Sequence, residues 1–295
     1  MNKSILVTGA SSGIGRAAAE LFAKSGYLVF ATYRKAEDGE ALARIENVHP
    51  IRMDVTRTED VVRAAAEVEA RVGTEGLYAV LNNAGVGYAA PFEFADEERG
   101  REVMEVNVMA PFRIAQKFLP LLKQFNLQND VKARIINISS WAGSLGQPFI
   151  PFYNASKFAI AGLTESMFYD LGLLDIHVVL ASPGITKTPL LGKTTRAGSE
   201  SLEHMTAEGR ARYAPLIEHY STLSVEYGNA PWFQTPEQVA QKLLRVVETK
   251  RPRFKYELAT DACFVDRFLA RFVPWTLKVA MNRRTFRLSS GTRAG

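Results

Sequence analysis

The first 25 residues most constrain what this chain can fold into, because a short apolar stretch runs directly into a glycine-rich turn. Residues 3–8 suit a β-strand, the turn Thr8-Gly9-Ala10-Ser11-Ser12-Gly13-Ile14-Gly15 follows, and residues 14–25 repeat apolar side chains at helical spacing up to Gly26. A strand that enters a helix through such a turn is the start of a parallel βα unit. The sequence therefore predicts an α/β protein.

The alternation of strand and helix continues along the chain. We expect strands at 27–33, 48–53, 77–82, 133–139, 176–182 and 252–258, and helices at 37–46, 58–72, 97–124, 153–173 and from 236 onward. Alternation of this kind gives right-handed βαβ units, and several strands are near-continuous apolar runs, as strands buried on both faces are. The prediction is a Rossmann-type doubly wound parallel sheet of about seven strands with helices on both faces.

Residues 184–235 interrupt this rhythm with prolines, glycines and charged residues. We expect an irregular insertion there, placed where a substrate lid would lie, because ligands of doubly wound sheets bind beyond the carboxyl ends of the strands. Residues 1–258 are predicted to form the catalytic domain that includes this insertion, and residues 259–295 a C-terminal helical extension of the same domain.

Composition narrows the class of protein. Hydrophobic residues make up 47% and charged residues 23% of the 295, and no apolar run reaches the ~18 residues of a membrane span. The apolar stretch runs straight into the glycine turn, so we do not expect a secretory signal peptide, and a single cysteine, Cys263, excludes an internal disulfide framework. We expect a cytoplasmic protein that forms a homodimer or homotetramer.

The net charge of +5 comes from the C-terminal part, since residues 245–295 hold twelve Lys or Arg and four Asp or Glu. The sequence shows neither a basic stripe with interleaved aromatic residues nor a known nucleic-acid recognition motif, so no nucleic-acid partner is expected. In the same region Phe264, Phe268 and Phe272, with Val265 and Leu269, form the apolar face of a predicted amphipathic helix that also carries Arg267 and Arg271. Three interpretations stay open: cover for its own domain or a subunit interface, which is favoured, a lid on the substrate pocket, or weak peripheral membrane contact.

The glycine turn is a candidate cofactor site. Glycines let the backbone approach a pyrophosphate, and the helix N-terminus offers N–H donors and a positive dipole end. The second strand ends in Thr32-Tyr33-Arg34-Lys35 with no acid before Glu37, so Arg34 and the Ser12 hydroxyl suit a ribose 2′-phosphate. This pattern predicts NADP(H) in preference to NAD(H); a plain surface cation is the alternative for Arg34.

Two side chains one helical turn apart, Tyr153 and Lys157, are candidate catalytic groups. Positions i and i+4 share one face of a helix, and a nearby cation favours phenolate, so we expect the pKa of Tyr153 to be lowered. A hydride delivered to a carbonyl carbon builds negative charge on its oxygen, which Tyr153 can protonate while Ser140 donates a hydrogen bond to it. On its own, the Tyr and Lys spacing is common on solvated helix faces.

Together these motifs resemble the short-chain dehydrogenase/reductase family, in the branch with hydroxysteroid and retinol dehydrogenases, over residues 3–257. The resemblance implies a CH–OH oxidoreductase (EC 1.1.1.-) with Asn107, Ser140, Tyr153 and Lys157 as the active tetrad, in which Lys157 also holds the nicotinamide ribose and Asn107 anchors a water. Asn107 as a helix-bending residue, and Asp54 as a turn-forming one, are the alternatives. The expected cofactor residues are Gly9, Ser11, Ser12, Gly13, Ile14, Gly15, Arg34, Asp54, Val55, Asn83, Ala84, Gly85, Tyr153, Lys157, Pro183, Gly184, Thr186 and Thr188.

The branch suggests a small-molecule carbonyl or alcohol substrate of lipophilic character, such as a steroid, retinoid or acyl compound. An apolar pocket is expected from Trp141, Phe149, Tyr213, Tyr220, Tyr227, Trp232 and Phe233, and no metal site is expected because the four histidines lack ligand spacing. Two other functions stay open: a non-catalytic NADP(H)-binding sensor or scaffold, and a β-ketoacyl reductase.

Overall fold

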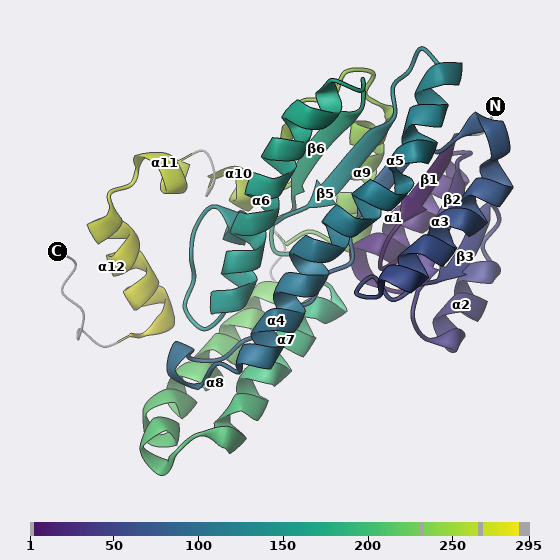
Figure 1. Cartoon of the computed structure of the whole chain (residues 1–295). Coiled ribbons are helices and arrows are strands. Elements are labelled where there is room, and N and C mark those ends of the chain that lie inside the picture. Colours follow the sequence, from purple (N-terminus) through teal and green to yellow (C-terminus); the bar gives the residue numbers. More distant parts are fainter. Residues whose placement is uncertain (1–2, 230–232, 265–267, 289–295) are drawn as a thin grey trace.

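Seven parallel strands form one sheet in a computed structural model that describes residues 3–229, 233–264 and 268–288 (Figure 1). The order across the sheet is β3-β2-β1-β4-β5-β6-β7. Successive strands are therefore added toward one edge from β1 to β3 and toward the other edge from β4 to β7. This is the predicted doubly wound fold. The strands are β1 (Ser4–Val7), β2 (Leu28–Tyr33), β3 (Val48–Arg52), β4 (Ala79–Asn82), β5 (Arg134–Ile138), β6 (His177–Ser182) and β7 (Lys255–Glu257).

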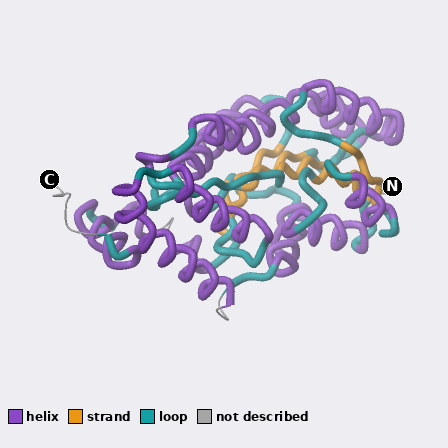
Figure 2. The backbone as a smooth tube through the Cα atoms, turned by 90° about the horizontal axis from the view of Figure 1, so that it is seen from below, coloured by secondary structure: helices purple, strands orange, loops and turns teal. Residues whose placement is uncertain are grey.

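Helices cover both faces of the sheet, and the view along its plane shows the strands between two helical layers (Figure 2). Helix α1 packs against α9, and α3 packs against α5. The helices of this part are α1 (Gly13–Lys24), α2 (Ala36–Ala43), α3 (Thr58–Val72), α4 (Glu97–Met104), α5 (Ala110–Gln128), α6 (Pro151–Gly172) and α9 (Pro236–Glu248), with short 3-10 turns η1 (Gly73–Glu75), η2 (Phe92–Phe94) and η4 (Trp141–Gly143).

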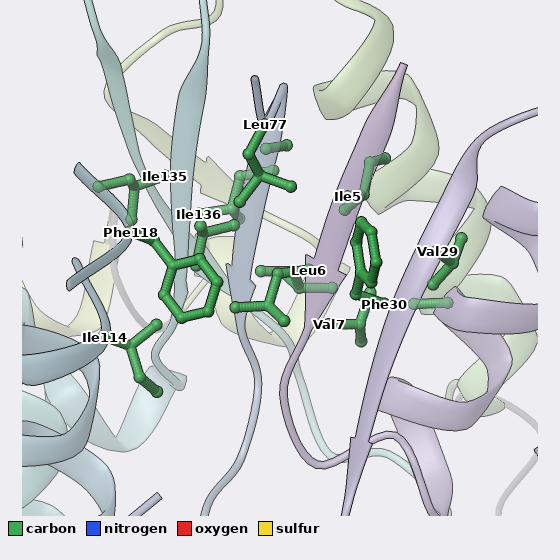
Figure 3. Close-up of a cluster of buried hydrophobic side chains, with 14 of the residues drawn as sticks. Ile5, Leu6, Val7, Val29, Phe30, Leu77, Ile114, Phe118, Ile135 and Ile136 are labelled. Atoms are coloured by element: carbon green, nitrogen blue, oxygen red, sulfur yellow. The ribbon is translucent and has the colours of Figure 1, made fainter. Parts of the chain in front are cut away.

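The main hydrophobic core lies between the sheet and these helices (Figure 3). Ile5, Leu6 and Val7 of β1 are fully buried, as are Ile135 and Ile136 of β5. Each such aliphatic side chain contributes about 1.5–3 kcal/mol of transfer free energy. Burial on both faces explains why these central strands are continuous apolar runs rather than alternating ones.

Two sequence expectations need correction in the middle of the chain. The segment 184–235 is largely helical, with α7 (Pro189–Ser201), a 3-10 turn η5 (Leu202–His204) and α8 (Ala207–Asn229), which pack against each other below the sheet in Figure 1. The prolines of this segment led to the prediction of irregular structure, but they do not break its helices. Pro189 occupies the favourable first turn of α7, and α8 accommodates Pro215 internally. The expected helix 97–124 is divided by a π-helical turn, η3 (Glu105–Met109).

The residues described after β7 within 260–288 form a largely helical C-terminal segment, which lies at the opposite end of the molecule from the N-terminus (Figure 1). Its described helices are α10 (Thr260–Phe264), α11 (Ala270–Phe272) and α12 (Trp275–Phe286). The expected helix spans α10 and α11, while its Val265 and Arg267 lie outside the described residues. None of the helices in the described ranges combines the length and apolar character that crossing a bilayer requires.

Candidate active site

A cavity of about 780 Å³ lies at the carboxyl ends of the strands. Its walls come from the loops that follow β1 to β6 and from α6, α7, α8 and α12. Every expected catalytic or cofactor-binding residue lines this cavity except two, Gly15 and Asn107. Segments more than 250 residues apart in sequence, the glycine turn and α12, thus face one space.

The glycines of the first turn have two different roles. Gly9 and Gly13 have φ values of +64° and +56°, where residues with a Cβ are strained, and both line the cavity. Gly15 instead faces the turn itself, since an added Cβ would lie 2.3 Å from the Gly9 carbonyl oxygen. Gly15 therefore allows α1 to pack against the turn, which explains its absence from the cavity wall.

Thr8 and Asn83 brace the turn against β4. The Thr8 hydroxyl accepts hydrogen bonds from the Asn83 and Ala84 amides, both at 3.0 Å, and the Asn83 side chain donates to the Thr8 carbonyl at 3.0 Å. These bonds join the ends of the two central strands, where the sheet changes direction. The turn is therefore held in place before any ligand binds.

The glycine turn fits a dinucleotide phosphate. Ser12, the N-cap residue of α1, is extended and its side chain makes no capping bond, and Ser11, Ser12, Gly13 and Ile14 all face the cavity. The first-turn N–H groups and the positive end of the helix dipole favour an anion at this point. No Cβ at Gly13 fills the space in front of the helix, where Thr188 approaches from the loop after β6.

Charged residues gather at the end of the cavity beside β2 and β3. Arg34 and Lys35 follow β2 and are exposed, and Asp38 and Asp54 line the same end. Asp54 Oδ1 accepts from the Thr56 amide at 3.0 Å and its hydroxyl at 2.8 Å, the turn-forming arrangement. Burial acts to raise the pKa of Asp54, but these bonds and the charges of Arg34 and Arg57 outweigh it, so the pKa lies below its usual value.

Ser140, Tyr153 and Lys157 meet at the centre of the cavity, where η4 returns the chain from β5 to α6. The Ser140 and Tyr153 side chains are hydrogen-bonded to each other. Lys157 Nζ donates to the Ile138 carbonyl at 3.1 Å and lies 5.6 Å from the centroid of the Tyr153 ring. Gly143 permits this close return, because a Cβ there would lie 2.6 Å from the Lys157 carbonyl oxygen.

Burial is the largest influence on the pKa values of Tyr153 and Lys157. It raises the pKa of Tyr153 above 10, with the Ser140 hydrogen bond acting in the opposite direction. It lowers the pKa of Lys157 to about 8. The expectation that the pKa of Tyr153 is lowered was therefore wrong for the protein without cofactor, because desolvation of the phenolate outweighs the stabilising influences around it.

Asn107 lies next to the cavity in the π-helical turn η3 rather than in its wall. Its amide oxygen accepts from the Val86 amide at 2.9 Å, and its amide nitrogen donates to the Val86 carbonyl at 3.0 Å and to Ser156 Oγ at 2.9 Å. The side chain is thus committed to the loop after β4 and to α6. Asn107 therefore fixes the loop after β4 and helix α6 relative to each other. Its Oδ1 and the Nζ of Lys157 both lie near Gly85.

The loop after β6 is tied to the C-terminal segment. Asp261 of α10 accepts a hydrogen bond from the Ile185 amide at 3.0 Å, and a Cβ on Gly184 would lie 2.0 Å from the same carboxylate. Lys187 donates through its amide to the Gln234 carbonyl at 3.1 Å, which fixes the other end of the loop. Sequence reasoning missed Asp261, since a lone acid in a helix carries no motif.

The remaining cavity wall is mainly apolar. Of the expected aromatics, Trp141 and Tyr220 line it, and Phe149 packs behind Tyr220 with ring centroids 6.0 Å apart. Tyr213 and Phe233 do not line the cavity. Trp232 and the side chain of Tyr227 lie outside the described part of the structure. Sequence reasoning did not identify Leu145, Ile150, Leu190, Leu191, Leu223, Leu269, Met281 and Phe286, nor the charged Arg99, Glu102, Lys193 and Lys278. Within the described ranges no cluster of metal-ligating side chains occurs.

A doubly wound sheet with a glycine turn after β1 and a Ser, Tyr and Lys cluster beyond β5 defines a dinucleotide-dependent oxidoreductase. The family model described as short chain dehydrogenase matches residues 3–198, and the chain belongs to this short-chain dehydrogenase/reductase family. Its members use NAD(P)(H) and act on small molecules.

Individual relatives agree with this assignment. The "NADPH-dependent 3-dehydrocapnine reductase" of Ornithobacterium rhinotracheale is 30% identical over 86% of this chain and 87% of that protein. Retinol dehydrogenase 5 of Mus musculus is 30% identical over 88% of this chain and 81% of that protein. Among solved structures, a short-chain dehydrogenase from Streptomyces avermitilis has a TM-score of 0.74 and 26% identity, covering 97% of both chains. The expected family and branch are thereby confirmed.

Proposed function

We propose that this protein is an NADPH-dependent reductase of lipophilic ketones in which Tyr153 donates the proton. The observation that carries the proposal is the cluster of partly buried Ser140 and Tyr153 with buried Lys157, in a cavity whose far wall is apolar. A phenol with a raised pKa stays protonated at neutral pH, which suits a proton donor to a ketone oxygen. The bound cofactor would supply the hydride.

The chain's own residues divide the remaining tasks. The Ser140 hydroxyl holds the substrate oxygen beside Tyr153, and stabilising the developing charge by one such donor contributes up to about 3 kcal/mol. Lys157 would bind the nicotinamide ribose and stabilise the phenolate left after proton transfer. Because the Asn107 side chain is committed to Val86 and Ser156, a relay water would be held by the main chain of the π turn.

The NADP(H) preference rests on the charges at the end of β2. Arg34 and Lys35 line the cavity there with Ser12, a set that suits a 2′-phosphate. Asp38 also lines this end and would favour a free ribose hydroxyl, so the cations must prevail. The name of the Ornithobacterium rhinotracheale relative, an NADPH-dependent reductase, agrees with this choice.

The roles assigned to the other expected cofactor residues follow the same geometry. Asp54 and Val55 would contact the adenine, Asn83 to Gly85 the adenosine side, and Pro183 to Thr188 the nicotinamide and pyrophosphate. We propose residues 1–258 as the catalytic domain and 259–295 as its extension. Exposed apolar side chains at Met109 of η3 and Phe112 of α5 support the proposal of a homodimer or homotetramer, which light scattering of the purified protein tests.

The test is a cofactor-oxidation screen with NADPH and NADH over steroids, retinoids, β-ketoacyl thioesters and small carbonyl compounds. Tyr153→Phe keeps the ring but removes the acid, so kcat should fall at least about a hundredfold, the scale of one general acid, with NADPH binding retained. Near-normal turnover of the Tyr153→Phe variant would contradict the proposed role of Tyr153 as the proton donor.

The cofactor preference needs its own variants. Arg34→Ala should raise KM for NADPH about tenfold and leave the kinetics with NADH unchanged, since one charge-assisted contact to phosphate is lost. Asp38→Asn is the matched control and should increase the preference for NADPH. A wild-type kcat/KM that is higher with NADH than with NADPH contradicts the proposal.

A further inference from the structure

The C-terminal segment, residues 260–288, presents an unusual amount of apolar surface to solvent. Six large hydrophobic side chains between Phe264 and Met281 are 42% to 72% exposed. They are Phe264, Phe268, Phe272, Trp275, Leu277 and Met281, and we call them the apolar patch. Gathering of such side chains on one short segment marks an interaction surface.

Three rings of the apolar patch contact one another in sequence order. The Phe264 and Phe268 ring centroids are 5.5 Å apart with the rings nearly parallel, and the Phe268 and Phe272 centroids are 6.4 Å apart. Leu269, between them in sequence, points inward and is only 8% exposed. The segment is therefore anchored on its inner side while the phenylalanine side faces outward.

Positive charge accompanies the apolar patch in the sequence. From residue 267 onward the sequence contains seven Lys or Arg and no Asp or Glu. Arg271, Arg284 and Arg287 are exposed close to the patch in sequence. Aromatic rings combined with an excess of cations over acids are the composition that binds the headgroup region of an anionic bilayer.

One face of α12 forms a wall of the cavity. Lys278, Met281, Asn282, Thr285 and Phe286 all line it, with the spacing of one helical face. Helix α8 holds this face in place, because His219 Nε2 lies 2.9 Å from the Thr285 carbonyl oxygen and the Tyr220 and Phe286 rings stack 6.1 Å apart. Met281 belongs to both surfaces, since it lines the cavity and is 42% exposed.

We propose that the apolar patch docks this protein on the surface of an anionic lipid bilayer. The rings of Phe264, Phe268, Phe272 and Trp275 would enter the interfacial region, and the arginines would contact lipid phosphates. Met281 then places the mouth of the cavity at the bilayer surface, so that a membrane-dissolved ketone enters without crossing water. This route for the substrate rests on the proposed function, whereas docking itself does not.

A second copy of the chain fits the patch less well than a bilayer does. Two-fold symmetric association brings the same surface of each copy together, so the arginines of one patch would face those of the other. No acidic residue follows residue 266 in the sequence, so each copy would bring an excess of cations to such a contact. Anionic lipid supplies the missing negative charge.

The first experiment measures co-sedimentation of the full chain with vesicles of phosphatidylcholine alone and with about one third phosphatidylglycerol. Wild-type protein should bind the anionic vesicles about tenfold more tightly, and high salt should remove the difference. The double variant Phe272→Glu/Trp275→Glu should lose about tenfold in binding, since two anchors become charges. Leu127→Glu on α5, which is 78% exposed, is the matched control and should bind like wild type.

Three outcomes would overturn the proposal: wild-type protein that stays in the supernatant, a double variant that binds like wild type, or patch substitutions that only dissociate a dimer seen by light scattering. All of these side chains are exposed, so equal melting temperatures should show that each variant is folded.

A second experiment compares turnover of a short water-soluble ketone with that of a long-chain ketone embedded in vesicles. The double variant should keep the first rate and lose at least about fivefold of the second, in proportion to its lost binding. Equal turnover of the embedded ketone by both proteins would overturn the substrate route. Failure of the wild type to oxidise NADPH with either ketone, while vesicle binding persists, would refute the proposed function and the substrate route but leave the docking proposal intact.

Discussion

Replacing Lys157 with methionine should abolish activity and make the protein without cofactor more stable. Lys157 is 6% exposed, and burial lowers its pKa from 10.5 to about 8. The unfolded chain therefore holds this proton more tightly than the folded protein does. Below pH 8 the folded state bears the full cost of a buried ammonium, which methionine of similar length removes.

The magnitude follows from the pKa shift. At about 1.4 kcal/mol per pKa unit, the fall from 10.5 to about 8 corresponds to about 3 kcal/mol. Methionine also loses the 3.1 Å hydrogen bond from Nζ to the Ile138 carbonyl, which contributes about 1.5 kcal/mol in the opposite direction. We therefore expect Lys157→Met to raise the free energy of unfolding at pH 7 by about 1–2 kcal/mol, or a few degrees of Tm.

The gain should depend on pH in a definite direction. Because the folded pKa is depressed, the stability of the wild type rises as pH increases from 8 toward 10.5, where Lys157 is neutral in both states. The variant lacks this rise. Its advantage should shrink across that interval and end as a small deficit equal to the lost hydrogen bond.

Urea unfolding of both proteins without cofactor, at several pH values from 7 to 10.5, measures the effect. Lys123→Met on the exposed side of α5 is the control and should change stability by less than about 0.5 kcal/mol. Two results would refute the reasoning: a Lys157→Met protein less stable than wild type at pH 7, or a stability difference that does not change with pH.

Three further perturbations test other parts of the structure. Arg134→Met removes the hydrogen bonds that the fully buried Arg134 donates to carbonyls at the end of α9 and should lower the free energy of unfolding by about 3 kcal/mol, as chemical denaturation would show. Asp261→Ala frees the Ile185 amide and should raise KM for NADPH severalfold with Tm changed little, whereas unchanged cofactor kinetics would assign Asp261 a purely structural role. Phe286→Ala removes the ring that stacks on Tyr220 and should raise KM for a long-chain ketone more than for a small one; equal effects on both would contradict its place in the substrate wall.

Local signals explain which parts of the site could be predicted. The glycine turn, Ser140, Tyr153 and Lys157 lie in short motifs whose spacing carries the chemistry, and the structure brings them to one cavity. Asp261 and Phe286 have no such pattern, because their roles arise from contacts with residues 76 and 66 positions away in sequence. Breaker residues likewise concealed α7 and α8, since pairing between helices outweighs weak local propensity.

The sequence by itself determined the parallel sheet and the family and predicted which side chains react, because period, turn chemistry and i, i+4 spacing are properties of neighbouring residues. Only the tertiary structure decided the ionisation of Tyr153 and Lys157, since burial by distant segments governs it. Tertiary structure also decided that α12 forms a wall of the cavity while the apolar patch faces outward. Which face of a terminal helix is covered depends on what packs against it, and no local pattern contains that partner.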